Sequence, residues 1–244
     1  MAIELPGEFV WVMNLLGLNW PQVNEDKVRE FAGHVKDFGT SLDTTHQAAT
    51  ATIKKMGEAY QANSYEQLVA RWSQMSNSHM TDLVEACRVT SVALDIAADG
   101  IVAAKLAVIT ELGIMAAEFV ADQAAAVFTF GAAEAAEALL IEASKKVINA
   151  ILQQVEQQII GDLIEKAVAP LESVVEKALG GLVFKGLDAA LGDPTASGGA
   201  GAGDGFRIHP GELTTHATAL HGHADEVVGH ATRFSAATAG MSFS

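Results

Sequence analysis

Apolar residues recur at steps of three and four along the first third of the chain, which is the period of an amphipathic α-helix. The stripe follows the segment "NWPQVNED" and comprises Val28, Phe31, Val35, Phe38, Leu42, Thr45, Ala49, Ile53 and Met56. Asn24 precedes it and has the side chain expected of a helix N-cap. The pattern predicts one long helix beginning just after Asn24.

A second stripe with the same period follows the segment "QANSYEQ", which is predicted to break the first helix. Ser64 and Gln67 have the spacing of a capping box, so the next helix is predicted to open there. Its inner face is traced by Leu68, Trp72, Met75, His79, Leu83, Ala86, Thr90, Leu94 and Ala97. Because the connection is short, the two helices must fold back on each other to bury both stripes.

The helical pattern continues to about Leu182, and no segment alternates with a period of two. Breaks are predicted near Gly113 and Gly131, at Pro170, and at the Gly180-Gly181 pair. The expected fold class is therefore all-α, an elongated bundle of long antiparallel helices.

The stretch from Ile101 to Gly131 is apolar enough to resemble a membrane span, but charged residues interrupt it. Lys105, Glu111, Glu118 and Asp122 would oppose insertion by roughly 10 kcal/mol, whereas the apolar side chains return only about 3 to 5 kcal/mol. Projected on a helix, Glu111, Glu118 and Asp122 fall within an arc of about 40°. The trio is interpreted as a polar seam or exposed stripe of a buried helix, with the lining of an oligomeric pore as the alternative.

The first twenty residues contain an apolar run, but Glu4 and Glu8 stand where a signal peptide carries basic residues. We expect no classical export signal. The uncharged run from Phe9 to Asn24 is too short and too polar to span a bilayer. It is predicted to be an anchor patch that docks on the helices of the same chain.

A glycine-rich segment, "GDPTASGGAGAGDGF", is predicted to be a linker before a C-terminal helix. On that helix, apolar residues at alternating steps of four and three form a heptad seam, which predicts a helical partner. The seam comprises Leu213, Ala217, Leu220, Ala224, Val227, Ala231 and Phe234. His209, His216, His223 and His230 repeat every seven residues beside it, too far apart to share one metal ion, and are interpreted as a solvated flank.

The net charge of −15 repels phosphate backbones, so nucleic acid is excluded as a partner. His79 and Cys87 lie about 12 Å apart along one predicted helix and cannot form a nucleophile and base pair. We find no convergent catalytic residues, no metal ligands and no cofactor motif, and expect a protein that is not an enzyme.

Two segments together resemble a known family. They are the paired helices around "ARWSQ" and the run "ALDIAADGIVAAKLAVITELGIMAAEFVADQAAAVFTFGAAEAAEALLIEASKKVINAILQQ" with "IEKAVAPLESVVEKAL" after it. They resemble the N-terminal domain of actinobacterial type VII secretion toxins of the CpnT type, in the Trp-X-Gly superfamily. "FRIHPGELTTHATALHGHADEVVGHATRF" is similar to the first helix of a further Trp-X-Gly module.

The resemblance implies a helical domain of residues 1–192, a linker of residues 193–205, and the start of a second module in residues 206–244. It implies export by the type VII machinery, to the cell surface or medium, with a small helical Trp-X-Gly-type protein or a second copy as partner. Trp72 is followed by Ser73 and Gln74, so only the tryptophan of the family motif is present. The Tyr-x-x-x-Asp/Glu export signal is missing, because Tyr60 is followed by Ser64 and Tyr65 by Val69 at that spacing.

Two functions are consistent with these features. The first is a secretion and interaction module without catalytic activity, with Trp72 and the C-terminal seam as the partner interface. The second is an oligomeric channel in an outer membrane, in which Glu111, Glu118 and Asp122 face the water. No toxin domain follows Ser244, so we expect either a stand-alone form or the delivery part of a larger protein.

Overall fold

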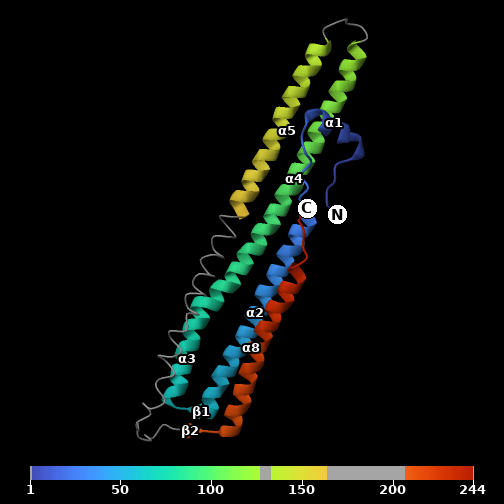
Figure 1. Ribbon diagram of the computed structural model, residues 1–244. Coiled ribbons are helices and arrows are strands. Elements are labelled where there is room, and N and C mark those ends of the chain that lie inside the picture. The colour runs from blue at the N-terminus through green and yellow to red at the C-terminus, as the bar shows by residue number, and fades with distance from the viewer. Residues whose placement is uncertain (1, 127–132, 164–206, 244) are drawn as a thin grey trace. The chain divides into compact units, whose positions relative to one another are not determined.

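A computed structural model describes residues 2–126, 133–163 and 207–243 (Figure 1). Long helices account for almost all of these residues: α2 (Glu25–Ala59), α3 (Asn63–Met75), α4 (Thr81–Ala126), α5 (Ala133–Leu163) and α8 (Pro210–Thr238). The short elements are a 3-10 turn, η1 (Gly7–Phe9), helix α1 (Val10–Leu16), a π-helical turn, η2 (Ser76–Met80), and strands β1 (Tyr60–Gln61) and β2 (Arg207–Ile208). The predicted all-α class is confirmed.

The first long helix begins as the sequence predicts. The backbone N–H of Lys27 donates to Asn24 Oδ1 at 3.1 Å, which is the bond of an N-cap side chain to the third helical residue. Glu25 and Asp26 place negative charge in the first turn, where the helix dipole favours it. Both the N-cap at Asn24 and the predicted break after the stripe of α2 are confirmed.

The connection between α2 and α3 differs in detail from the prediction. β1 pairs antiparallel with β2, Tyr60 opposite Ile208, and this bridge holds the chain extended up to Ala62. As a result α3 begins at Asn63, and Ala62 occupies the N-cap position without a side-chain bond. The predicted capping box is wrong, because Ser64 already lies inside the helix and its hydroxyl bonds that of Tyr60.

The break predicted near Gly113 is also wrong, because α4 runs through it without interruption. A glycine inside a helix costs only about 1 kcal/mol relative to alanine, and packing along the rest of a long helix offsets that. At this point the Phe9 ring approaches the backbone, and a Cβ on Gly113 would lie 3.8 Å from Phe9 Cζ. Gly131, Pro170, Gly180-Gly181 and the glycine-rich linker lie outside the described residues.

The described chain divides into two compact units, each assembled from segments far apart in sequence. The first unit, which we call unit 1, combines residues 2–32, 92–126, 133–163 and 241–243. The second, unit 2, combines residues 33–91 and 207–240. The predicted boundaries at residues 192 and 205 stay a prediction.

The core of unit 1 forms where α1 packs against α4 and α5 (Figure 1). It contains Val12, Met13 and Leu16 of α1, Val108, Leu112 and Met115 of α4, and Ile148 of α5. Gly17 ends α1 in the left-handed region, with φ of 62°, which glycine adopts without strain. The anchor patch predicted for Phe9 to Asn24 is therefore confirmed, since α1 supplies three of the buried side chains.

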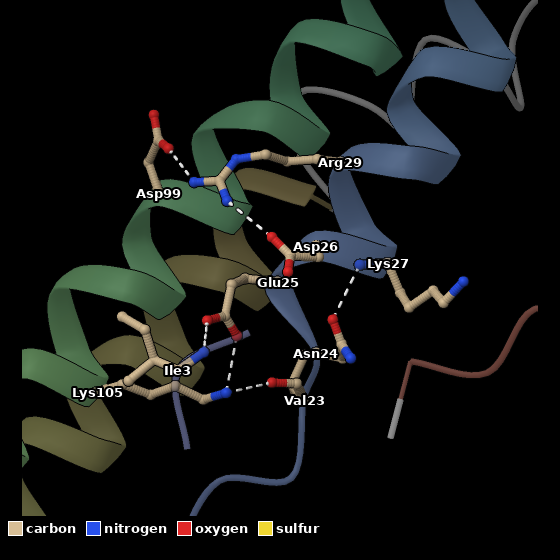
Figure 2. A network of polar contacts seen from close by, with 9 residues as sticks. All are labelled: Ile3, Val23, Asn24, Glu25, Asp26, Lys27, Arg29, Asp99 and Lys105. Atoms are coloured by element: carbon tan, nitrogen blue, oxygen red, sulfur yellow. Dashed lines mark hydrogen bonds and ion pairs between the residues drawn. The ribbon is translucent and has the colours of Figure 1, made fainter. Parts of the chain in front are cut away.

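A buried ion pair ties the start of α2 to α4 within unit 1 (Figure 2). Lys105 Nζ lies 2.8 Å from Glu25 Oε2, and their side chains are only 3% and 1% exposed. The Lys105 ammonium also donates to the Val23 carbonyl at 2.7 Å, and the backbone N–H of Ile3 donates to Glu25 Oε1. Burial alone would raise the pKa of Glu25, but these bonds outweigh it and hold that pKa below its ordinary value.

In unit 2, α2 approaches α3 and α4 closely at two glycines. A Cβ on Gly39 would lie 2.7 Å from Cys87 Cβ, and a Cβ on Gly57 would lie 2.7 Å from Tyr65 Cζ. The Tyr65 hydroxyl donates to the Ile53 carbonyl at 3.1 Å. Burial raises the pKa of the Cys87 thiol, which stays protonated and serves as a small packing residue.

Candidate partner-binding groove

Trp72 is held against α2 by one stack and one hydrogen bond. Its ring lies 5.2 Å from that of His46, with 20° between the two planes. Its indole N–H donates to Thr50 Oγ1 at 2.9 Å. His46 and Thr50 are four residues apart and so lie on one face of α2. The tryptophan is thus fixed in the last turn of α3, which ends at Met75, and does not lie in the connection between α2 and α3.

His46 connects the tryptophan to the π-helical turn η2. Its Nε2 lies 2.7 Å from the hydroxyl oxygen of Ser76, the first residue of η2. Its Nδ1 is buried and has no hydrogen-bond partner among the described residues. Burial lowers the pKa of His46, and the nearby Asp43 carboxylate opposes this only in part. The imidazole is therefore neutral at pH 7.

Helix α8 forms the other side of this region through polar and aromatic contacts with α2. His230 Nε2 lies 2.9 Å from Thr45 Oγ1, and His223 Nε2 lies 3.2 Å from Thr52 Oγ1. The Phe234 ring stacks on that of Phe38, with centroids 5.0 Å apart. Two of the four heptad histidines therefore bind α2.

The interpretation of those histidines as a solvated flank is wrong for His223 and His230. On the side of α8 that meets α2, histidines alternate with Leu, Val or Phe. The hydroxyl groups of Thr45 and Thr52 on α2 are the partners of His230 and His223. Ala217, Ala224 and Ala231 of the predicted seam are exposed. His216 is half-buried and His209 is exposed.

Between α2, α3 and α8 lies an open, mainly apolar groove of about 440 Å³, all of it within unit 2. Leu68, Trp72 and Met75 line it from α3, and Leu68 and Met75 are exposed. Its polar lining residues are Thr45, His46 and His223. The remaining lining residues are Ala49, Ile53, Met80, Leu220, Ala224 and Val227. An apolar groove of this size, edged by a few polar groups, suits the side chains of a partner helix.

The structure brings together several residues predicted for the partner interface. Trp72, Leu220, Ala224 and Val227 share the groove, and Phe234 packs beside it on Phe38. Leu213 is half-buried nearer the start of α8, and Ala217 and Ala231 lie outside the groove lining. Sequence reasoning missed His46, Thr50 and Ser76. The i, i+4 pair of His46 and Thr50 on one predicted helix was the available signal.

The acidic trio predicted as a polar stripe or pore lining lies on α4. Glu111 is half-buried and Glu118 is exposed, whereas the side chain of Asp122 lies outside the described part. Among the residues that the structure describes, no helix is long and apolar enough to cross a membrane. Within the same residues, no cluster of three or more His, Cys, Asp or Glu could hold a metal ion.

The chain matches a known family model but no curated protein or solved structure. Searches against curated proteins and against solved structures each return no match. A family model described as "WXG100 like domain" matches residues 4–144, more than half of the chain, and spans α1 to α4 with the start of α5. The chain belongs to the WXG100-like domain family.

Proposed function

We propose that this chain is a non-enzymatic helical module that delivers or partners a toxin secreted by the type VII machinery. The observation that carries the proposal is the WXG100-like match over residues 4–144. WXG100-like domains are helical modules associated with type VII secretion, and WXG100 proteins self-associate or pair with other helical proteins. Residues 206–244, as the start of a second Trp-X-Gly-like module, would then contribute one wall of the partner site.

The CpnT-type resemblance supports the toxin-delivery part of this proposal. The groove beside Trp72 supports the pairing part, because it leaves apolar side chains such as Leu68 and Met75 open to a partner. An exposed apolar groove without a partner is otherwise a liability, since exposed apolar patches promote nonspecific association.

Co-expression with a small helical protein of the Trp-X-Gly type tests the pairing. We expect a stable complex on gel filtration, weakened by Met75→Gln, which changes an exposed groove residue. Val228→Gln is the matched control, because Val228 is also exposed and apolar but lies outside the groove lining. A monodisperse monomer that ignores every such partner would contradict the proposal.

A further inference from the structure

Helix α4 carries an exposed apolar surface within unit 1. Its principal members, Val92, Ile96, Leu106 and Ile114, are each between 47% and 50% exposed. Ala103 and Ala117 are exposed on the same side. At 100° per residue, the positions from Val92 to Ala117 that carry these side chains fall within an arc of about 80°. We call this set the α4 stripe.

The α4 stripe lies on the side of the helix opposite the core of unit 1. Val108, Leu112 and Met115 are fully buried against α1 and α5, and they project about 140 to 200° from the centre of the stripe. The stripe runs from Val92 to Ala117, a rise of about 37 Å along the helix and between three and four heptads. That length suffices for a helix-on-helix seam.

Two polar residues, Asp99 and Thr110, interrupt the stripe, and both side chains are already bonded. The Arg29 guanidinium binds Asp99 Oδ1 at 2.6 Å, and the Thr110 hydroxyl donates to the Leu106 carbonyl at 2.9 Å. The Asp99 charge is therefore paired within the chain, and the Thr110 hydroxyl is bonded within its own helix. Isolated polar residues at seam positions are used in coiled coils to fix the register of two helices.

Acidic residues flank the stripe. Asp95 is exposed on one side, and Glu118 and the half-buried Glu111 lie on the other. The only basic residue of α4 beyond Val92 is Lys105, and its charge is buried in the pair with Glu25. The stripe therefore presents an apolar seam with negative edges, and its electrostatic complement is an apolar seam with positive edges.

We propose that the α4 stripe docks an amphipathic helix of another protein whose apolar heptad seam is flanked by Lys or Arg. A second copy of this chain is disfavoured as the occupant, because it would bring the same acidic edges and the same net charge of −15. The inference rests on the proposed function in one respect, namely that the chain acts by pairing with a helical protein.

Binding of designed helical peptides to the full chain tests this. The probe is a fluorescent peptide of roughly the same length as the stripe, with Leu at the seam positions and Lys at the flanks. A Glu-flanked version and a scrambled version of the Lys peptide are the comparison peptides. Fluorescence anisotropy should show binding of the Lys-flanked peptide alone, weakening as salt rises because the attraction is screened. Equal binding of the scrambled or the Glu-flanked peptide would overturn the proposal.

Variants locate the binding site. The triple variant Ile96→Gln, Leu106→Gln and Ile114→Gln keeps the helix propensity and the charge of α4 and should weaken binding at least about tenfold. The matched control changes the exposed apolar residues Leu139, Val147 and Val228 to Gln and should leave binding unchanged. Circular dichroism of both triple variants checks folding. Equal losses in the two well-folded variants would refute the assignment to α4.

Reversing the charges at the edges of the α4 stripe gives an outcome that nonspecific hydrophobic binding cannot produce. Asp95→Lys with Glu118→Lys should reverse the preference toward the Glu-flanked peptide. Sedimentation of the full chain alone should show no dimer that depends on the stripe. A dimer that dissociates in the triple variant Ile96→Gln, Leu106→Gln and Ile114→Gln would instead assign the stripe to a second copy. A stripe variant that pairs normally with the small helical protein while losing the peptide would separate this surface from the proposed function.

Discussion

Glu25 and Lys105 lie 80 residues apart in sequence, yet they form an ion pair of 2.8 Å that is almost wholly buried (Figure 2). The pair fixes the start of α2 on α4, and the bonds from Ile3 and to Val23 attach the N-terminal segment to the same point. Lys105, which interrupts the apolar stretch of the sequence, is thus part of the interior of unit 1.

Removing one partner of this pair should cost far more than removing an exposed pair. Lys105→Met leaves the Glu25 carboxylate buried without its counter-charge, which costs about 3 to 5 kcal/mol. The double variant Glu25→Gln with Lys105→Met should recover much of that loss, because Gln still accepts from Ile3 and no buried charge remains. Urea unfolding measures both.

Lys146→Met is the matched control for that experiment. Lys146 and Glu142 are 76% and 65% exposed and pair at 3.0 Å across one turn of α5. Such a surface pair contributes only about 0.3 to 0.5 kcal/mol. A loss in Lys146→Met as large as that in Lys105→Met would contradict the structural role of the buried pair.

Acid should weaken unit 1 through Glu25. The folded-state pKa of Glu25 lies below its ordinary value of 4.5, so its stabilising contribution is present above that pH and is lost as the pH falls through the folded pKa. A thermal melt series from pH 7 to pH 3 should show this loss, and Glu25→Gln should flatten the acid limb. An unchanged acid limb in that variant would show that other carboxylates control the transition.

Because the pKa of His46 is lowered, the stability of unit 2 should also depend on pH, in a higher pH range than that set by Glu25 in unit 1. Its folded-state pKa is lowered by burial, so the contribution of the neutral ring is full above its ordinary value of 6.5 and is lost as the pH falls from there through the folded pKa. Charging the ring should also quench the stacked Trp72. Fluorescence titration should therefore show a transition below pH 6.5 that His46→Gln removes. The exposed His221→Gln should leave it in place.

The contact between Gly39 and Cys87 should tolerate no side chain. Gly39→Ala would place a Cβ 2.7 Å from Cys87 Cβ and should destabilise the protein by about 1 to 3 kcal/mol, because α2 and α4 must separate. Gly33 lies six residues earlier in α2 with no atom within 4 Å of its would-be Cβ. Gly33→Ala should be neutral or stabilising by up to about 1 kcal/mol. Thermal melts measure both variants. Equal changes in stability in Gly39→Ala and Gly33→Ala would contradict the close approach of α2 and α4 at Gly39.

The helical period predicted the long helices well, because each buries one face along its length and the stripe is visible in the residues themselves. Asn24 as N-cap and α1 as an anchor could be predicted for the same local reasons. Gly113 could not, since whether a glycine breaks a helix depends on what packs around it. The capping box at Ser64 failed because a bridge to β2, more than 140 residues away, sets where α3 begins.

The candidate site was predicted only in part. Trp72 and the apolar residues of α8 could be found from spacing, but the histidines of α8 could not be assigned to the interface. Their partners, Thr45 and Thr52, lie on a helix about 170 to 185 residues earlier, and no local pattern links them. His46 and Ser76 likewise come together only because α3 folds back along α2.

Export of the chain in strains with and without the type VII secretion ATPase tests the proposed function most directly. The full chain should appear in the culture medium or on the cell surface of the parent strain and remain inside cells that lack the ATPase. Retention in both strains, while a control substrate is exported normally, would contradict its role as a type VII secretion module.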